Sequence, residues 1–348
     1  MKRAAVIIFI ITACMSVIPA NACTSAIVAP KASATGRPML WKHRDTGCES
    51  NFVERIPADG NNHGYVALFN AGDSLLREAW MGMNDAGFAI MNTASYNLAP
   101  DTAAYKDREG EVMTEALRRC SSVDDFEQLL VAMPKPLGVQ ANFGVIDAEG
   151  NGAYFETDDY KFTKFDLADA PEGVLIRTNF SFSGNDTDGY GYIRYDNASH
   201  LLEEKIASRS LTPADFTEGV SRSFYHSLLG YDAMADTARW VVDQDFVPRF
   251  TSTASVVIEL NGNDSGVMWT SLGYPPCAIV EAATPEYVPD ELRPLMPGHK
   301  SSAAEKAIVE KRKAFPIKKG NGQMYIDMDF VRKASKVCHE KSMKNYAR

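Results

Sequence analysis

The sequence has few residues of the types that build metal or redox centres. Its 348 residues include six cysteines and six histidines, with no C-x-x-C pair and no cysteine–histidine cluster. Structural zinc sites and iron–sulfur clusters usually show such spacing. We therefore expect no metal site, and no pattern in the chain calls for an organic cofactor.

Long apolar runs are also scarce. Residues 4–13 form an apolar stretch directly after Lys2 and Arg3, and Ala20-Asn21-Ala22 follows as a small-residue cleavage site. This is the pattern of a secretory signal peptide. A membrane-spanning helix needs about 20 apolar residues, and no later run reaches that length. We expect residues 1–22 to be a signal peptide and the remaining chain to be periplasmic or extracellular, without a transmembrane segment.

Positive charge is scarce outside the C-terminal segment. The net charge is −9, yet residues 300–348 contain 13 Lys/Arg against 5 Asp/Glu, so the preceding chain carries about −17. We predict a basic C-terminal extension over 299–348, with a solvated helix at 302–315; docking on an anionic surface or on the acidic body is the alternative. Because no basic face interleaved with aromatic residues occurs, nucleic acid is not expected as a partner.

The residue directly after the expected cleavage site is Cys23. Cleavage would give this residue both a thiol and a free α-amine, whose ordinary pKa of about 7.7–8.0 suits a base near neutral pH. These two groups are the minimal equipment of an N-terminal nucleophile amidohydrolase. The run Ile11-Thr12-Ala13-Cys14 offers a different outcome, in which Cys14 is lipidated, Cys23 stays internal and the protein is a lipid-anchored binding protein without catalysis.

Local patterns predict a mixed chain of hairpins and helices. Apolar segments at 26–29 and 39–42 flank the turn Thr35-Gly36-Arg37-Pro38, so we expect a hairpin that returns residues 42–45 toward Cys23. The remaining strands and helices are expected by the same criteria. The strands are expected at 52–56, 65–69, 88–92, 143–147, 153–157, 174–178, 255–260 and 267–271, and the helices at 111–119, 123–131, 194–207 and 213–223. This order suggests one α+β domain over residues 23–298, with two sheets and the helices outside.

Four segments carry a family resemblance. They are Cys23-Thr24-Ser25, the run 36–45 (GRPMLWKHRD), the run 82–92 beginning GMNDAGF, and the run 174–179 (VLIRTN). In this order they resemble the cysteine N-terminal nucleophile (Ntn) hydrolases that include choloylglycine hydrolase, penicillin V acylase and the acyl-CoA:6-aminopenicillanate acyltransferases. The resemblance implies a four-layer αββα sandwich of two antiparallel sheets.

The same resemblance implies an activity without a cofactor. It implies that the substrate is a linear, non-peptide N-acyl amide with an apolar acyl group, cleaved through an acyl-thioester. An acyltransferase that passes the acyl group to an amine is the alternative. Relatives often assemble, so a homo-oligomer stays open.

The resemblance also implies roles for five residues. Cys23 would be the nucleophile, Asp45 would orient its α-amine, Asn92 and Asn179 would donate to the oxyanion, and Arg194 would support the site from the start of a helix.

Other residues are expected near the substrate. Lys42 stands where bile salt hydrolases have an arginine; it keeps the charge but loses the bidentate fork. Trp41, Phe180 and Trp269 are candidates for lining an acyl pocket, and Arg249 is a further arginine with no better claim than Arg194.

Four cysteines have no expected catalytic role. Export would permit disulfides, and three pairings remain open among Cys48, Cys120, Cys277 and Cys338.

Overall fold

The computed structural model describes residues 22–262, 266–294, 296 and 299–347. The expected signal peptide, apart from Ala22, and the candidate lipidation site Cys14 lie outside the described residues.

A six-stranded antiparallel sheet contains the expected N-terminal hairpin. Its strand order is β10-β1-β2-β14-β15-β16. These strands are β10 (Val174–Arg177), β1 (Thr24–Val28), β2 (Met39–Asp45), β14 (Ser252–Leu260), β15 (Gly266–Leu272) and β16 (Glu281–Ala283). In the hairpin, Thr24 lies opposite His43. The first residue of β1 and the last of β2 therefore lie at the same end of the sheet.

A seven-stranded antiparallel sheet follows the order of the chain, from β3 to β9. Its strands are β3 (Asn51–Ile56), β4 (Tyr65–Asn70), β5 (Met81–Asn84), β6 (Phe88–Ala94), β7 (Ala141–Asp147), β8 (Gly152–Thr157) and β9 (Phe162–Asp166). The remaining strands form two small sheets: β11 (Tyr225–His226) with β12 (Tyr231–Asp232), and β13 (Trp240–Val242) with β18 (Met324–Asp327) and β17 (Ile317–Lys318).

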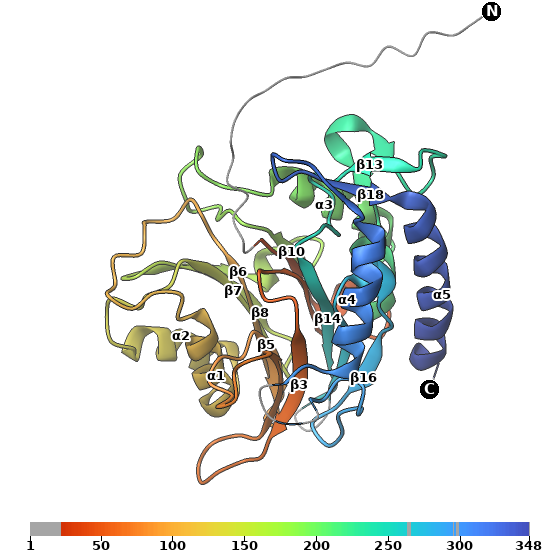
Figure 1. Ribbon diagram of the computed structural model, residues 1–348. Helices are drawn as coiled ribbons and strands as arrows, with labels where there is room; N and C mark the ends of the chain where they lie inside the picture. The colour runs from red at the N-terminus through yellow and green to blue at the C-terminus, as the bar shows by residue number, and fades with distance from the viewer. Residues whose placement is uncertain (1–21, 263–265, 295, 297–298, 348) are drawn as a thin grey trace, which may run out of the picture.

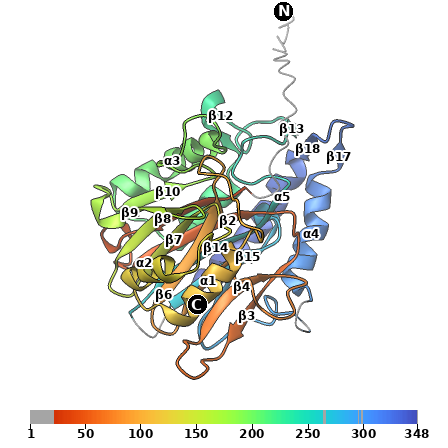
Figure 2. The ribbon, with the colours of Figure 1, turned by 90° about the vertical axis from the view of Figure 1, so that its left-hand side faces the viewer.

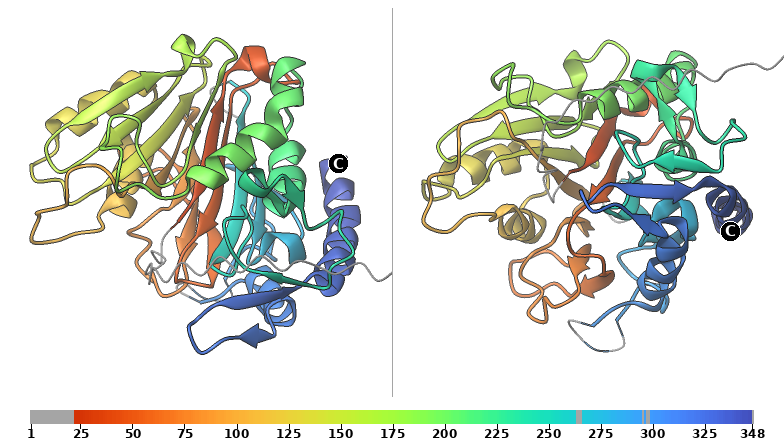
Figure 3. Two further views of the ribbon diagram at one scale, coloured as in Figure 1. Left: turned by 90° about the horizontal axis from the view of Figure 1, so that it is seen from above. Right: turned by 45° about the horizontal axis from the view of Figure 1, so that its top comes forward.

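Helices cover the outer faces of both large sheets. Helices α1 (Glu109–Arg119) and α2 (Val123–Ala132) lie on the seven-stranded sheet, whereas α3 (Tyr192–Ala207), α4 (Ser302–Ala314) and α5 (Met328–Tyr346) lie beside the six-stranded sheet (Figure 1 and Figure 2). The view from above shows the layers as helices, sheet, sheet and helices (Figure 3). This arrangement confirms the expected α+β, four-layer αββα sandwich.

Every residue of β2 is buried, both the apolar run Met39–Trp41 and the polar run Lys42–Asp45. Leu40 packs in the core between the sheets, whereas Met39 and Trp41 point to the opposite face and pack in the core beneath α3. Successive side chains of a strand alternate between faces, so a central strand with helices on one side and a sheet on the other buries all of them. The same alternation positions the site described below.

The C-terminal segment is helical, as expected, but it is packed into the same body as the rest of the chain. Ala304 of α4 joins the core between the sheets, and Met328 and Val331 of α5 are fully buried in a separate cluster. Strand β18 also pairs with β13. Helices α4 and α5 are therefore packed against the rest of the folded chain. Among the helices that the structure describes, none combines the length and the apolar character that a bilayer crossing requires.

The segment expected as a helix at 213–223 contains shorter turns instead. A π-helical turn at Asp215–Gly219 leads directly into a 3-10 turn at Val220–Arg222.

Candidate active site

Cys23 lies directly before β1 and is only 6% exposed. Its backbone nitrogen donates to Asn179 Oδ1 at 2.9 Å, and its Sγ lies 3.9 Å from the backbone oxygen of Asp45. Residue 22 is attached in this structure, so the amide N–H of Cys23 stands in for the α-amine that cleavage would create. Both the nitrogen and the thiol therefore have defined positions.

Asn179 and Arg194 hold the Cys23 backbone from the side of β10 and α3. Because β10 pairs with β1, Asn179 follows β10 next to Cys23. Arg194 is fully buried and donates to Cys23 O at 2.6 Å, Thr24 Oγ1 at 3.0 Å and Asn179 Oδ1 at 2.7 Å. Burial, and to a smaller extent the nearby Arg249, lowers the pKa of the Arg194 guanidinium to about 9. Arg194, near the start of α3, thus contacts both Cys23 and Asn179.

The side-chain amide of Asn179 is oriented by its neighbours. Its Nδ2 donates to Ala94 O at 2.8 Å, and its Oδ1 accepts from Cys23 N and from Arg194. Asn179 Oδ1 therefore orients the nitrogen of Cys23. A side-chain NH₂ carries two N–H groups, so the bond to Ala94 O uses one of them, and the oxyanion role that the resemblance implies stays a prediction.

Gly191 allows Arg194 to reach this position. Gly191 has a φ of +84°, which favours glycine, and a Cβ at this residue would lie 2.3 Å from Arg194 Nη2. Any larger residue would displace the guanidinium or the backbone.

Asp45 lies at the end of β2, with its carboxylate on the face of the sheet that carries α3. The carboxylate accepts from Arg249 Nε at 2.8 Å and from Ser252 Oγ at 2.6 Å, and His43 Nε2 lies 3.6 Å away. Arg249, which the sequence does not favour over Arg194, is thus the ion-pair partner of Asp45. The Asp45 backbone oxygen, rather than its carboxylate, contacts the Cys23 thiol.

His43 does not form a base for the thiol. Its Nε2 shares a hydrogen bond with Ser252 Oγ at 2.8 Å, and complete burial lowers its pKa to about 4. The ring is therefore neutral at pH 7 and bonds to Ser252 rather than to Cys23.

Lys42 projects to the opposite face of β2, toward the seven-stranded sheet. Its Nζ donates to Asn92 Oδ1 at 2.7 Å and to Trp80 O at 2.9 Å. Burial lowers the pKa of the Lys42 ammonium from 10.5 to about 7. The bond from Lys42 orients the side-chain amide of Asn92. The NH₂ group of Asn92 has no described partner.

A cavity of about 330 Å³ opens beside Cys23, between the ends of the two sheets. Its lining is Cys23, Lys42, Arg44, Asp45, Thr46, Asn70, Glu78, Trp80, Asn92, Ala94, Tyr105, Lys106, Asp107 and Glu109. Most of these residues are polar or charged, but their apolar atoms form about half of the exposed lining surface. Burial raises the pKa of the Glu109 carboxyl to about 7, so this acid titrates near neutral pH.

The structure corrects the expected aromatic acyl pocket. Trp41 is fully buried on the other face of β2, where it packs on Phe216 and donates to Ser255 Oγ. Phe180 stacks on Tyr192, and neither Trp41 nor Phe180 lines the cavity beside Cys23. Trp269 is also absent from that lining.

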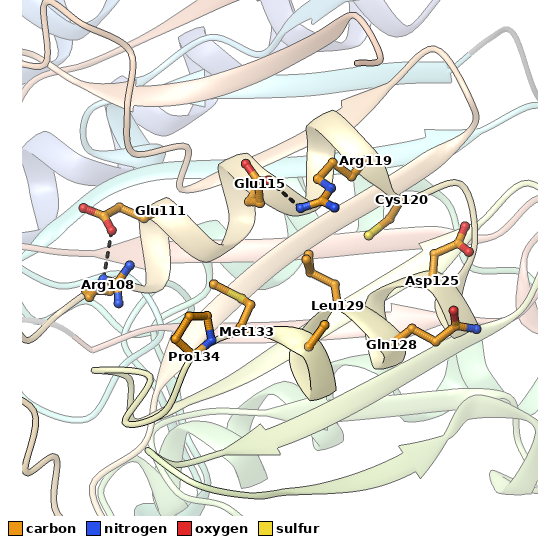
Figure 4. A pocket seen from close by; sticks show the side chains of 11 residues that line it. Arg108, Glu111, Glu115, Arg119, Cys120, Asp125, Gln128, Leu129, Met133 and Pro134 are labelled. Carbon is orange, nitrogen blue, oxygen red and sulfur yellow. Dashed lines mark hydrogen bonds and ion pairs between the residues drawn. The ribbon is translucent and has the colours of Figure 1, made fainter. Parts of the chain in front are cut away.

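A larger groove of about 600 Å³ lies between α1 and α2 (Figure 4). The charged side chains along α1 are paired with one another, as in Arg108–Glu111 and Arg119–Glu115 at 2.9 Å each. Its thiol, Cys120, is buried, and burial raises its pKa to about 12. The groove therefore offers no reactive nucleophile, in contrast to the smaller cavity at Cys23.

The other cysteines form no disulfides in the described part of the chain. Cys48, Cys120, Cys277 and Cys338 are all free. In the same described residues, no three His, Cys, Asp or Glu side chains are placed together to hold a metal ion.

Two residues of the site, Ser252 and Glu109, lie outside the sequence motifs, and a third, Arg44, lies in the run 36–45 without an expected role. Arg44 and Ser252 follow from strand alternation once the pairing of β2 with β14 is known. Glu109 enters the cavity from the start of α1, far from the other residues in the chain. Only the predicted hairpin could have indicated Arg44, because it lies next to Asp45.

Comparison with known proteins gives matches in structure only. No protein-family model matches the chain, and no curated protein matches it in sequence. Solved structures that resemble it include the N-acylethanolamine-hydrolyzing acid amidase ortholog of Caenorhabditis elegans, with 16% identity over 68% of this chain and 92% of that one, at a TM-score of 0.44. Penicillin V acylase from Agrobacterium tumefaciens matches with 14% identity over 75% and 86% of the two chains and a TM-score of 0.44. A mutant of the conjugated bile acid hydrolase from Clostridium perfringens matches with 12% identity over 71% and 89%, at a TM-score of 0.41.

Proposed function

We propose that the protein is an exported cysteine N-terminal nucleophile hydrolase that cleaves a linear amide C–N bond. The proposal requires removal of the signal peptide between Ala22 and Cys23. One observation carries it: the Cys23 nitrogen and thiol are both fixed beside a cavity, by Asn179 Oδ1 at 2.9 Å and by Asp45 O at 3.9 Å.

The reaction would use two groups of the same residue. The free α-amine takes the thiol proton, and the thiolate attacks the amide carbonyl carbon to form a tetrahedral oxyanion. The protonated amine then gives its proton to the leaving nitrogen as the C–N bond breaks, which leaves a thioester on Cys23. Water attacks the thioester and releases the acid. Asn179 and Arg194 keep the amine and the Cys23 carbonyl in place throughout.

Asn92 and Lys42 are the side chains best placed to stabilise the oxyanion. Both line the cavity with Cys23, and the Lys42 bond to Asn92 Oδ1 leaves the Asn92 NH₂ group as a donor. Loss of one such donor slows catalysis roughly 100- to 1,000-fold in well-studied hydrolases. We assign the oxyanion role to Asn92 and Lys42.

The test begins with the exported protein. Its intact mass and N-terminal sequence should show a chain that starts Cys-Thr-Ser-Ala, and a panel of N-acyl amides should release amine. Cys23→Ala should abolish turnover while thermal unfolding stays close to that of the wild type. Cys338→Ala is the matched control, because this half-buried thiol lies on α5 and should leave turnover unchanged.

Two results would contradict the proposal. One is a lipidated N-terminus at Cys14 in active protein, and the other is full turnover in Cys23→Ala. Product analysis with an added amine separates the hydrolase from the acyltransferase, because only the latter would form a new amide.

A further inference from the structure

Two buried basic side chains line the cavity beside Cys23 without an acidic partner. The side chains are those of Lys42 and Arg44, which are 2% and 3% exposed. No acid in the described part of the chain lies within ion-pair distance of either. A buried charge is costly unless a counter-charge or several hydrogen bonds compensate it.

The contacts of Arg44 are neutral and leave donors free. Nη1 donates to Asn51 Oδ1, and Nη2 donates to Asn70 Oδ1 at 2.9 Å. A guanidinium has five N–H groups, so three have no described partner. The guanidinium also lies over the Trp80 ring, at 5.1 Å from its centroid, and this fixes its plane.

Lys42 adds a further donor to the same wall. Its two described bonds go to neutral oxygens of Asn92 and Trp80, and an ammonium has three N–H groups. Lys42 and Arg44 alternate with His43 on β2, so both side chains project from the same face of the strand toward the seven-stranded sheet.

The acids of the lining form no ion pair with Lys42 or Arg44. Asp45 pairs with Arg249 on the other face of the strand. Glu109 accepts from the backbone nitrogen of Gln140, while Asp107 is exposed and Glu78 half-exposed near the cavity mouth. None of the four neutralises Arg44 by direct contact.

We propose that Lys42 and Arg44 form a carboxylate-binding subsite, so that the substrate is a small amide that carries a carboxylate near its scissile bond. This inference rests on the proposed function and replaces the apolar acyl group that the family resemblance implies. A planar guanidinium with free N–H groups matches the two oxygens of a carboxylate. A volume of about 330 Å³ suits a small substrate.

A binding experiment tests the subsite without catalysis. Glutarate is titrated into the exported Cys23→Ala protein by calorimetry, with the neutral diamide glutaramide as its isosteric control. Glutarate should bind and glutaramide should not. Adding Arg44→Gln should weaken glutarate binding roughly 10- to 100-fold, as expected for the loss of charge-assisted hydrogen bonds.

Two further variants separate charge from structure. Arg44→Lys keeps the charge but loses the planar fork of N–H groups, so its glutarate affinity should lie between those of the Cys23→Ala protein and the Arg44→Gln variant. A purely structural role of Arg44 would instead make both Arg44 variants fail alike. Arg119→Gln removes an exposed arginine of α1 that pairs with Glu115 and should leave binding unchanged. Equal binding of glutarate and glutaramide, or unchanged binding in Arg44→Gln, would overturn the proposal.

Turnover then shows which half of the substrate carries the carboxylate. Glutaryl-p-nitroanilide is compared with its carboxamide analogue, and N-butyrylglycine with N-butyrylglycinamide. The subsite is supported if one acid is turned over with a kcat/KM at least roughly tenfold above that of its carboxamide, and if Arg44→Gln removes this preference. The preferred acid then shows whether the acyl half or the amine half of the substrate carries the carboxylate. Turnover without a preference overturns the subsite proposal. Glutarate binding without any amidase activity would instead refute the proposed function and leave the subsite intact.

Discussion

The ion pair between Asp45 and Arg249 predicts a large loss of stability in Asp45→Asn. The carboxylate is fully buried and accepts from Arg249 Nε at 2.8 Å and Ser252 Oγ at 2.6 Å. Asparagine keeps the size and one acceptor, but it leaves the Arg249 guanidinium, 10% exposed, without a counter-charge. Removing one partner of a buried pair costs about 3–5 kcal/mol, so we expect the free energy of unfolding to fall by that amount.

Urea denaturation of the exported protein measures this change. The control is Asp85→Asn, because Asp85 is 46% exposed and its contact with His63 lies at the surface. That variant should differ from the wild type by about 0.5 kcal/mol or less. In the double variant Asp45→Asn/Arg249→Met, the free energy of unfolding should fall by less than the sum of the losses in the two single variants. Neither charge is then left buried without its partner. An Asp45→Asn protein within about 0.5 kcal/mol of the wild type would refute this account of the site.

Three further predictions concern the residues around Cys23. Arg194→Met removes the bonds that hold Cys23 O and Asn179 Oδ1 and should lower kcat roughly 100-fold, as small displacements at a nucleophile do; kcat near the wild-type value in a folded variant would argue against it. Gly191→Ala places a Cβ 2.3 Å from Arg194 Nη2 at a φ of +84° and should lower both kcat and the melting temperature, whereas Gly219→Ala, where a Cβ has open space, should leave kcat as it is. Burial lowers the pKa of the Lys42 ammonium from 10.5 to about 7 in the folded state. Between these two pH values the unfolded chain binds more protons than the folded chain. The free energy of unfolding should therefore rise by up to about 1.4 kcal/mol per pH unit. Lys42→Met should remove this slope in urea denaturation at pH 7, 8 and 9, and identical slopes in both proteins would contradict the burial argument.

The hairpin that brings Asp45 back to Cys23 could be predicted because its signals are local. A turn between two apolar segments fixes the pairing, and antiparallel pairing then places the start of β1 beside the end of β2. The hairpin depends on short stretches of sequence, for which turn residues and periodicity are informative. Arg194, in contrast, was expected only from the family resemblance.

The environment of each side chain could not be predicted in the same way. Trp41 is buried on the helix side of β2 rather than in the cavity, because both faces of this strand are covered and its sequence does not show which face is which. The orientation of the Asn179 amide depends on Ala94 of the other sheet. The polar lining likewise arises where Glu109 and Asn70 meet residues of β2, a juxtaposition that only tertiary packing creates.

The central claim is that Cys23 acts as an N-terminal nucleophile. The most direct measurement is the intact mass of the exported protein, taken before and during rapid mixing with an amide that it cleaves. We expect a chain that begins at Cys23 and gains the mass of one acyl group, at a site that mapping assigns to Cys23 and that Cys23→Ala lacks. Active protein that retains the Ala22–Cys23 bond, or an acyl group on any other residue, would contradict the account.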